Sequence, residues 1–131
     1  GHIFFADRYL GYDDALYATL RLLEIIASTG RTMSQLLVDV PETFNTPEIR
    51  VDCPDEVKFQ VVEKITDHFK SLHEVIDIDG VRVLFDDGWG LVRASNTQPA
   101  LVLRFEAMSE KRLGEIRTYV ESALARVIAD S

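Results

Sequence analysis

Short strand-forming segments recur between residues 48 and 106, and they constrain the fold more than any other feature. At the start of this region, in 48–52, apolar and polar residues alternate, and the same alternation returns in 101–106. Between them lie three further short β patterns, at 74–78, 81–85 and 89–93. Alternation of period two puts the apolar side chains on one face of a strand, so we expect a sheet with one buried face.

Two helical patterns complete this region. Pro54 suits the first turn of a helix, and a second helix is expected to begin at Ser109. The first carries an expected buried stripe of Val57, Val61, Ile65, Phe69 and Leu72. From residue 48 the expected order is β-α-β-β-β-α, counting the three short segments after the first helix. Asp79-Gly80, between the segments 74–78 and 81–85, suits a type I′ hairpin. The expected fold class is α+β, an antiparallel sheet flanked by two helices.

Residues 12–29 form a separate helical pattern that ends at Gly30. Its apolar residues spread over more than one face, so the helix needs partners on more than one side. The residues before it are too few to supply them. The polar, proline-containing stretch 34–47 is expected to be a connector. We therefore expect two parts, 1–40 and 41–131.

The bulk properties exclude several classes of function. A formal net charge of −8 argues against nucleic-acid binding, which depends on Lys and Arg neutralising phosphates. The longest apolar run is far shorter than the roughly 20 residues of a membrane span, and no secretory signal is visible. The single cysteine cannot form an internal disulfide, which favours the cytoplasm. We expect neither nucleic acid nor membrane as a partner.

The loop Arg93-Ala94-Ser95-Asn96-Thr97, between two expected strands, is the strongest candidate site. Arginine presents a fork of donors that matches phosphate oxygens. Hydroxyl, amide and backbone N–H groups of a tight loop can bind the remaining oxygens. Polar clusters of this composition also form simple turns. Composition alone therefore leaves both phosphate binding and a plain turn open.

Three stretches of the chain resemble the α-D-phosphohexomutase family. The run RASNTQPALVLRFEA is similar to the phosphate-binding signature of that family's last domain. GHIFFADRYLGYDDALYATLRLLEII resembles the segment that follows the family's sugar-recognition loop, and FNTPEIRV resembles the start of the last domain. The matches follow the family order and cover nearly the whole chain. Asn96-Thr97-Gln98-Pro99, where glucosamine-type mutases carry Gly-Thr-Glu-Pro, indicates the phosphomannomutase/phosphoglucomutase type.

The resemblance implies roles for individual residues. Within the loop, the phosphate of a bound sugar would be held by Arg93, Ser95, Asn96 and Thr97, with the Ala94 backbone beside them. Gly1 and His2 match the end of the sugar-recognition loop, where the histidine lies near the reacting hydroxyls. A Gly-His pair can also remain after removal of a tag, but the following Ile3-Phe4-Phe5 continues the family pattern.

The resemblance also implies a domain assignment and a reaction. Residues 1–40 would end the preceding α/β domain, and 41–131 would be the last domain. The reaction interconverts hexose 1-phosphate and 6-phosphate through a phosphoserine and a hexose 1,6-bisphosphate, with Mg²⁺ held by three aspartates. The serine and the aspartates belong to earlier domains and have no matching motif here. We therefore expect this polypeptide alone to be inactive, with a phosphosugar and the missing N-terminal domains as its partners.

Four other candidates favour structural roles. Arg104 shares a strand face with Glu106 and lies roughly 16 Å along a strand from Pro99, which favours a surface ion pair over a phosphate contact. His68 and His73 are spaced wrongly for one shared helix face, and no further metal ligands accompany them. Cys53 precedes a helix start, where a lowered thiol pKa is conceivable, but no base neighbours it in sequence. We expect a structural cysteine.

The remaining polar candidates lie in turns or strands. Four aspartates bound one short strand and are expected to be solvated turn residues rather than a metal site: Asp77, Asp79, Asp86 and Asp87. Trp89, between two glycines, is most simply a strand residue, and a position near the loop stays open. Neither feature points to chemistry.

A non-catalytic interaction or scaffold module is the alternative function. In that case the loop is only a turn, and helix 12–29 is a docking surface, since fold alone does not decide function. An Arg93→Ala variant would distinguish the two, because it removes phosphate binding only if the loop binds phosphate. The same helix, lacking partners, is expected to pack on the rest of the chain or self-associate.

Overall fold

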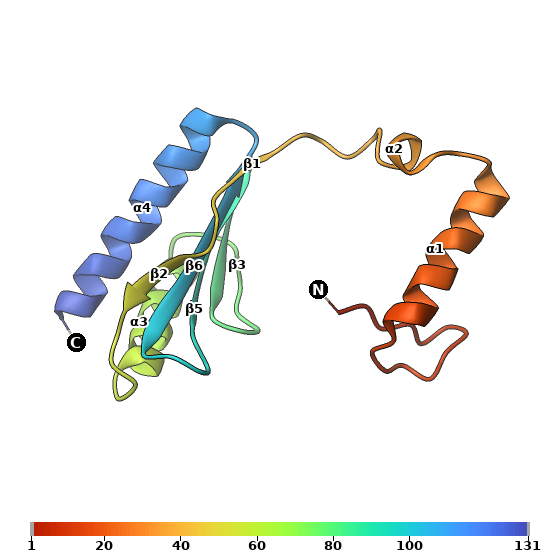
Figure 1. Cartoon of the computed structure of the whole chain (residues 1–131). Coiled ribbons are helices and arrows are strands. Elements are labelled where there is room, and N and C mark those ends of the chain that lie inside the picture. Colours follow the sequence, from red (N-terminus) through yellow and green to blue (C-terminus); the bar gives the residue numbers. More distant parts are fainter. Residues whose placement is uncertain (1, 131) are drawn as a thin grey trace. The chain divides into compact units, whose positions relative to one another are not determined.

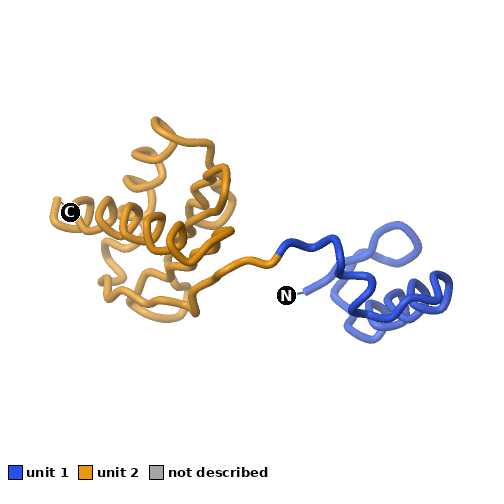
Figure 2. Tube along the Cα trace, turned by 90° about the horizontal axis from the view of Figure 1, so that it is seen from above, with its two compact units in different colours: residues 1–41 blue, residues 42–131 orange. Residues whose placement is uncertain are grey.

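The computed structural model describes residues 2–130 (Figure 1). They form two compact units, Gly1–Pro41 and Glu42–Ser131, which are coloured separately in Figure 2. The first unit contains the helices α1 (Ala15–Thr29) and α2 (Met33–Leu36). The second contains all six strands and the two remaining helices. Each unit is described by itself.

Helix α1 is the only long helix of the first unit and has well-defined ends. Asp14 is extended and caps the helix by accepting a hydrogen bond from the Tyr17 backbone N–H at 2.9 Å. Gly30 ends it in the left-handed region, at φ 64°, a conformation that glycine adopts without steric cost. The helix predicted at 12–29 thus ends as expected but begins at Ala15, because Asp14 serves as the cap.

The apolar side chains of α1 are largely uncovered within its own unit. None of the residues of α1 is buried, and Leu16, Leu20 and Leu23 are exposed. This agrees with the expectation that the helix needs partners on more than one side, whereas its self-association stays a prediction. No helix within residues 2–130 combines the length and the apolar character that crossing a membrane requires.

The second unit is built on one antiparallel sheet in the order β1-β6-β5-β4-β3, with β2 also paired to β6. Its strands are β1 (Phe44–Asn45), β2 (Ile49–Asp52), β3 (Val75–Ile76), β4 (Val81–Phe85), β5 (Gly88–Ala94) and β6 (Ala100–Ala107). Strands β1 and β2 lie along the same edge of β6, at its two ends. Strand β6 is therefore paired on both of its edges, with β1 and β2 on one side and β5 on the other.

Helices α3 (Lys58–Lys70) and α4 (Glu110–Ala129) pack against each other and cover one face of the sheet (Figure 1). The core between these layers contains Val61, Ile65 and Phe69 of α3 together with Ile116, Val120 and Leu124 of α4. The sheet contributes Val81, Val83, Val92, Leu101, Leu103 and Phe105. The opposite face of the sheet carries Arg82, Arg93 and Arg104 together with the apolar Leu91 and Val102. A sheet with two helices on one face is the α+β arrangement expected from the sequence.

The predicted order of elements was short by one strand. Four strands, not three, separate α3 from α4, because the alternating segment after the polar loop is the full strand β6. The expected connector 34–47 also contains the end of α2 and the whole of β1. Thr32 and Gln35 close a capping box on α2, and β1 is held by pairing with β6. Helix α3 ends at Lys70, so Leu72 is exposed instead of buried.

The turn before β4 also differs from the prediction. Ile76 pairs with Arg82 and β4 begins at Val81, so residues 77–80 form the turn, which is longer than a two-residue hairpin. Gly80 has φ 79°, and no described non-glycine residue has a positive φ, whereas a type I′ turn needs positive φ at both central residues. A Cβ on Gly80 would lie 2.6 Å from Arg93 Cβ and closer still to the Val92 carbonyl oxygen. The turn thus packs directly against strand β5.

We predict that Gly80→Ala destabilises the second unit. The substitution imposes both an unfavourable φ and a collision with β5, at a cost of about 1–3 kcal/mol or more. Gly114→Ala is the matched control, because Gly114 lies in α4 with nothing within 4 Å of its Cβ position, and alanine there should add roughly 0.5–1 kcal/mol. Thermal unfolding followed through Trp89, the single tryptophan, should show a lower Tm for the first variant and a higher one for the second. Equal Tm values would contradict the prediction.

Candidate phosphate-binding site

The polar loop joins the end of β5 to the start of β6 and is braced from within. The Ser95 N–H donates to the Ala100 carbonyl at 2.9 Å, which closes the base of the loop. The Ser95 hydroxyl accepts hydrogen bonds from the backbone N–H groups of Thr97 and Gln98, at 3.4 and 3.2 Å. A hydroxyl that accepts two bonds still has its own O–H to donate. Ser95 therefore shapes the loop and keeps one donor for a ligand.

The tip of the loop offers donors that the protein does not use. Asn96 and Thr97 are exposed. Within residues 2–130, no hydrogen bond is made by the Asn96 N–H or by the side chains of these two residues. A backbone N–H, an amide and a hydroxyl are thus directed toward solvent within two residues. Unpaired donors gathered in one turn can bind an anion.

Arg93 lies at the end of β5, where the loop begins. Its Nη1 donates to Asp79 Oδ2 at 3.1 Å, and its side chain is about one-third exposed. Asp79 precedes Gly80 in the turn, and Gly80 packs against Val92 and Arg93. This contact occupies one part of the guanidinium fork, and arginine has five N–H donors in all. The remaining donors are free to bind a second anion.

Three more arginines, Arg50, Arg82 and Arg104, share the open face of the sheet with Arg93. In the strand register, Arg50 and Arg93 both pair with Val102, while Arg104 pairs with Leu91. Arg104 is therefore two residues along β6, or about 7 Å from the row that contains Arg93. Four guanidinium groups thus share one sheet face in a chain whose net charge is −8, and three of them are paired with Glu48 or Asp79.

Glu48 is the carboxylate among these arginines. It receives a hydrogen bond from Arg50 Nε at 2.9 Å and lies 3.7 Å from Arg104 Nη2. The bond from Arg50, and the positive charges of Arg50, Arg104 and Arg93, hold the pKa of Glu48 below its ordinary value. The expected surface pair of Arg104 is thus made with Glu48, the residue before β2, rather than with Glu106.

Lys58 is a site residue that sequence reasoning missed. It is the first residue of α3, and its side chain is only 5% exposed. Its ammonium group donates to the carbonyl oxygens of Ser95 and Gln98, at 2.6 and 3.1 Å, and to Asp55 at 2.6 Å. The loop therefore rests on a buried cation. The 37 and 40 residues between these partners leave no local sequence signal that could have revealed the contact.

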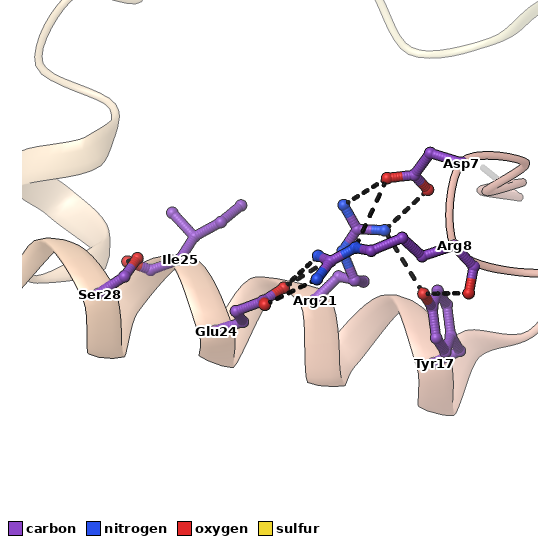
Figure 3. Close-up of polar contacts among 7 residues, drawn as sticks. All are labelled: Asp7, Arg8, Tyr17, Arg21, Glu24, Ile25 and Ser28. Atoms are coloured by element: carbon purple, nitrogen blue, oxygen red, sulfur yellow. Dashed lines mark hydrogen bonds and ion pairs between the residues drawn. The ribbon is translucent and has the colours of Figure 1, made fainter.

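His2 belongs to the other unit, and Gly1 lies outside the described residues. The ring of His2 is exposed, and its Nδ1 contacts Asp13 Oδ2. The segment that follows His2 is held against α1 by two arginine–carboxylate pairs (Figure 3). Arg21 binds Asp7 through two hydrogen bonds, of 2.9 and 3.0 Å. The second pair joins Arg8 to Glu24 at 2.6 and 3.1 Å.

We predict that acid releases the Asp7–Arg21 clamp. The hydrogen bond from Arg21 lowers the pKa of Asp7 from 3.8 to about 2. Since the folded-state pKa is depressed, the stabilisation is present above about pH 4 and is lost as the pH falls through about 2. An NMR titration of the Asp7 carboxyl carbon should have its midpoint near pH 2, and Arg21→Gln should move the midpoint toward 3.8. A midpoint near 4 in the unmodified chain would contradict the prediction.

The remaining sequence candidates make structural contacts. His73 bonds to Tyr119 through Nε2 at 3.0 Å, and burial raises the pKa of the Cys53 thiol, consistent with a structural cysteine. No group of three or more potential metal ligands occurs among the described side chains. Three of the four turn aspartates, expected to be merely solvated, form ion pairs: Asp77 with Lys70, Asp79 with Arg93, and Asp87 with Arg112. Trp89 packs against the guanidinium of Arg82.

Two family models match the chain. The model described as "Phosphoglucomutase/phosphomannomutase, C-terminal domain" matches residues 48–123. The model described as "Phosphoglucomutase/phosphomannomutase, alpha/beta/alpha domain III" matches residues 1–44. The first match contains the complete loop and all four of these arginines of the open sheet face. The second contains His2 and the clamped segment that follows it.

Known proteins match nearly the whole chain. A phosphomannomutase/phosphoglucomutase of Pseudomonas putida is 44% identical over 97% of this chain and 28% of its own length. A phosphoglucomutase of Neisseria gonorrhoeae is 42% identical over 95% of this chain and 27% of its own. The crystal structure of a phosphoglucomutase/phosphomannomutase family protein from Burkholderia thailandensis is similar, with a TM-score of 0.78 and 40% identity, covering 97% of this chain and 27% of that one. This chain thus spans little more than a quarter of the length of these relatives.

Proposed function

Because the chain belongs to the phosphoglucomutase/phosphomannomutase family, we propose that the loop Arg93–Thr97 holds the phosphate group of a hexose phosphate. The enzyme to which this part belongs would interconvert hexose 1-phosphate and 6-phosphate through a phosphoserine and a bisphosphorylated sugar. The loop would clamp the phosphate that is not reacting. Holding that end of the substrate places the other end in line for transfer.

One observation carries this proposal. The Asn96 N–H and the side chains of Asn96 and Thr97 have no partner among residues 2–130, and they follow Arg93, which uses one of its five guanidinium donors on Asp79. A phosphate group is an acceptor with several oxygens, so it can engage a guanidinium fork and loop donors together. The loop contains no carboxylate, imidazole or thiol. Its chemistry therefore suits binding and orientation rather than proton or phosphoryl transfer.

The first unit would contribute recognition of the sugar. His2, with Gly1 before it, is proposed to lie near the hydroxyls of the bound sugar, and Asp13 would orient the imidazole ring through the Nδ1 contact. The Arg21–Asp7 and Arg8–Glu24 pairs would fix the backbone that follows. His2 is the one residue here that we propose to act close to the reacting atoms.

Magnesium and the nucleophile are assigned to other parts of such an enzyme. The family resemblance implies Mg²⁺ held by three aspartates, but the described residues contain no cluster suited to a metal ion. The residues present therefore do not fit that group, and no step of the reaction is assigned to a metal here. The role proposed for this chain is complete without one, since clamping a phosphate requires only donors and positive charge.

We predict that Arg93→Ala abolishes the response of the loop to phosphosugar. In an NMR titration with glucose 6-phosphate, the amide resonances of residues 95–97 should shift in the unmodified chain, with weak, millimolar affinity. Loss of a charged hydrogen-bond donor should weaken binding by roughly tenfold or more. Arg117→Ala is the matched control, because Arg117 lies on α4 and pairs with Glu121. Unphosphorylated glucose should shift nothing, and a loop that ignores glucose 6-phosphate at millimolar concentration would contradict the proposal and favour a simple turn.

We also predict that the 131-residue polypeptide does not interconvert glucose 1-phosphate and glucose 6-phosphate by itself. In our proposal it supplies the clamp, whereas the nucleophilic serine belongs to another part of the enzyme. A coupled assay for either product should give the buffer rate at any protein concentration. Turnover that scales with protein and disappears in Arg93→Ala would show that the chain holds more of the catalytic machinery than proposed.

A further inference from the structure

We propose that Lys58 is a positioning residue that sets the binding conformation of the loop from its buried side. The two carbonyls that it binds, those of Ser95 and Gln98, flank the exposed tip formed by Asn96 and Thr97. One ammonium group therefore holds both ends of the tip. The consequence for ligand binding rests on the proposed phosphate role of the loop.

The hydrogen bonding of Lys58 is complete. A lysine ammonium has three donors, and here two are used by the loop carbonyls and the third by Asp55 Oδ1. A buried charge is costly unless its hydrogen bonds are satisfied. The loop supplies two of the three acceptors, so the buried state of Lys58 depends on the loop conformation. The reverse also holds in part, because displacing the ammonium would leave the Ser95 carbonyl without a donor, whereas the Gln98 carbonyl would keep the bond from the Ala100 N–H at 2.8 Å.

The helix that carries Lys58 does not explain the residue. Lys58 is at the N-terminus of α3, where the helix dipole disfavours a cation. The preceding Val57 makes no side-chain capping bond there. A lysine at this position therefore slightly destabilises the helix that it begins. What a lysine gains at this position is its pair of contacts with Ser95 and Gln98 in the loop after β5.

These contacts also determine which groups of the loop face a ligand. Carbonyl oxygens repel phosphate, whereas N–H groups attract it. Lys58 draws the Ser95 and Gln98 carbonyls inward, and the Asn96 N–H is left without a partner among residues 2–130. Lys58 would thus favour an anion through backbone orientation, without touching it.

The far end of the loop has separate attachments. The Cys53 N–H donates to the Pro99 carbonyl at 3.0 Å, and Arg50 contacts the Gln98 side chain. These bonds would keep residues 98–99 in place if Lys58 were replaced. Replacement of Lys58 should therefore loosen the tip, Asn96 and Thr97, without unfolding the strands.

The test compares Lys58→Met with Asp55→Asn in the full 131-residue chain. Methionine fills the buried volume without charge or donors. The asparagine variant removes the charged partner of Lys58 but leaves both loop carbonyls bound. In the ligand-free chain, Lys58→Met should lower the NMR order parameters of the Asn96 and Thr97 amides and leave those of residues 101–106 unchanged. With glucose 6-phosphate it should weaken binding by about tenfold, while Asp55→Asn stays near the unmodified affinity.

The outcomes separate the two proposals. If the unmodified chain binds glucose 6-phosphate and Arg93→Ala does not, but Lys58→Met binds normally with an ordered tip, Lys58 has no positioning role. Equal losses of affinity in Lys58→Met and Asp55→Asn would also overturn it, because they would assign the effect to the ion pair alone.

If neither the unmodified chain nor any variant binds glucose 6-phosphate, the phosphate role of the loop fails. The order parameters of the tip then still decide the role of Lys58. Should Lys58→Met not fold, Lys58→Gln is measured in the same way, and failure of both to fold would assign Lys58 to stability rather than to positioning.

Discussion

Pairing of β6 with its neighbours is the interaction on which both the core and the candidate site depend. Leu101, Leu103 and Phe105 face the helices, while Arg104 faces the open side of the sheet. A slip of one residue would exchange the two faces, exposing the core residues and burying a guanidinium group. The same register pairs Ala94 with Leu101, which sets the ends of the polar loop. Burial of apolar side chains thus determines where the donors that we propose to bind phosphate are placed.

Much of this architecture could be predicted from local patterns, and the parts that could not are those that tertiary pairing decides. Helices α3 and α4 and the long strands have clear periodicity, and their buried faces follow it. Strands β1 and β3 span two residues each, too few to show a period, and exist because they pair with β6 and β4. The Asp79-Gly80 pair is a strong hairpin signal, but the register of β3 with β4 places it in a longer turn.

The candidate site was predictable to a similar degree. Composition suggested that residues 93–97 could bind an anion, and the family resemblance gave the individual residues their roles. The sequence could not reveal Lys58, since a lysine at the start of a helix ordinarily points to solvent. Nor could it show that Arg50, Arg93 and Arg104 share one face, which follows only from the strand register. An overall negative charge therefore does not exclude a positive site where strands bring distant arginines together.

The close packing of Gly80 on β5 fixes the position of the Arg93 side chain. Because the turn that carries Asp79 is in contact with the strand that carries Arg93, the guanidinium is anchored to the rigid sheet rather than to the loop. The donors of Asn96 and Thr97, in contrast, belong to a tip that extends beyond the sheet. In the proposed function, recognition of the phosphate would thereby be divided between Arg93, which is fixed on the sheet, and the loop tip, whose residues can be exchanged without disturbing the sheet. Residues 95–98 could vary to accept a differently shaped ligand while the anchor keeps its place.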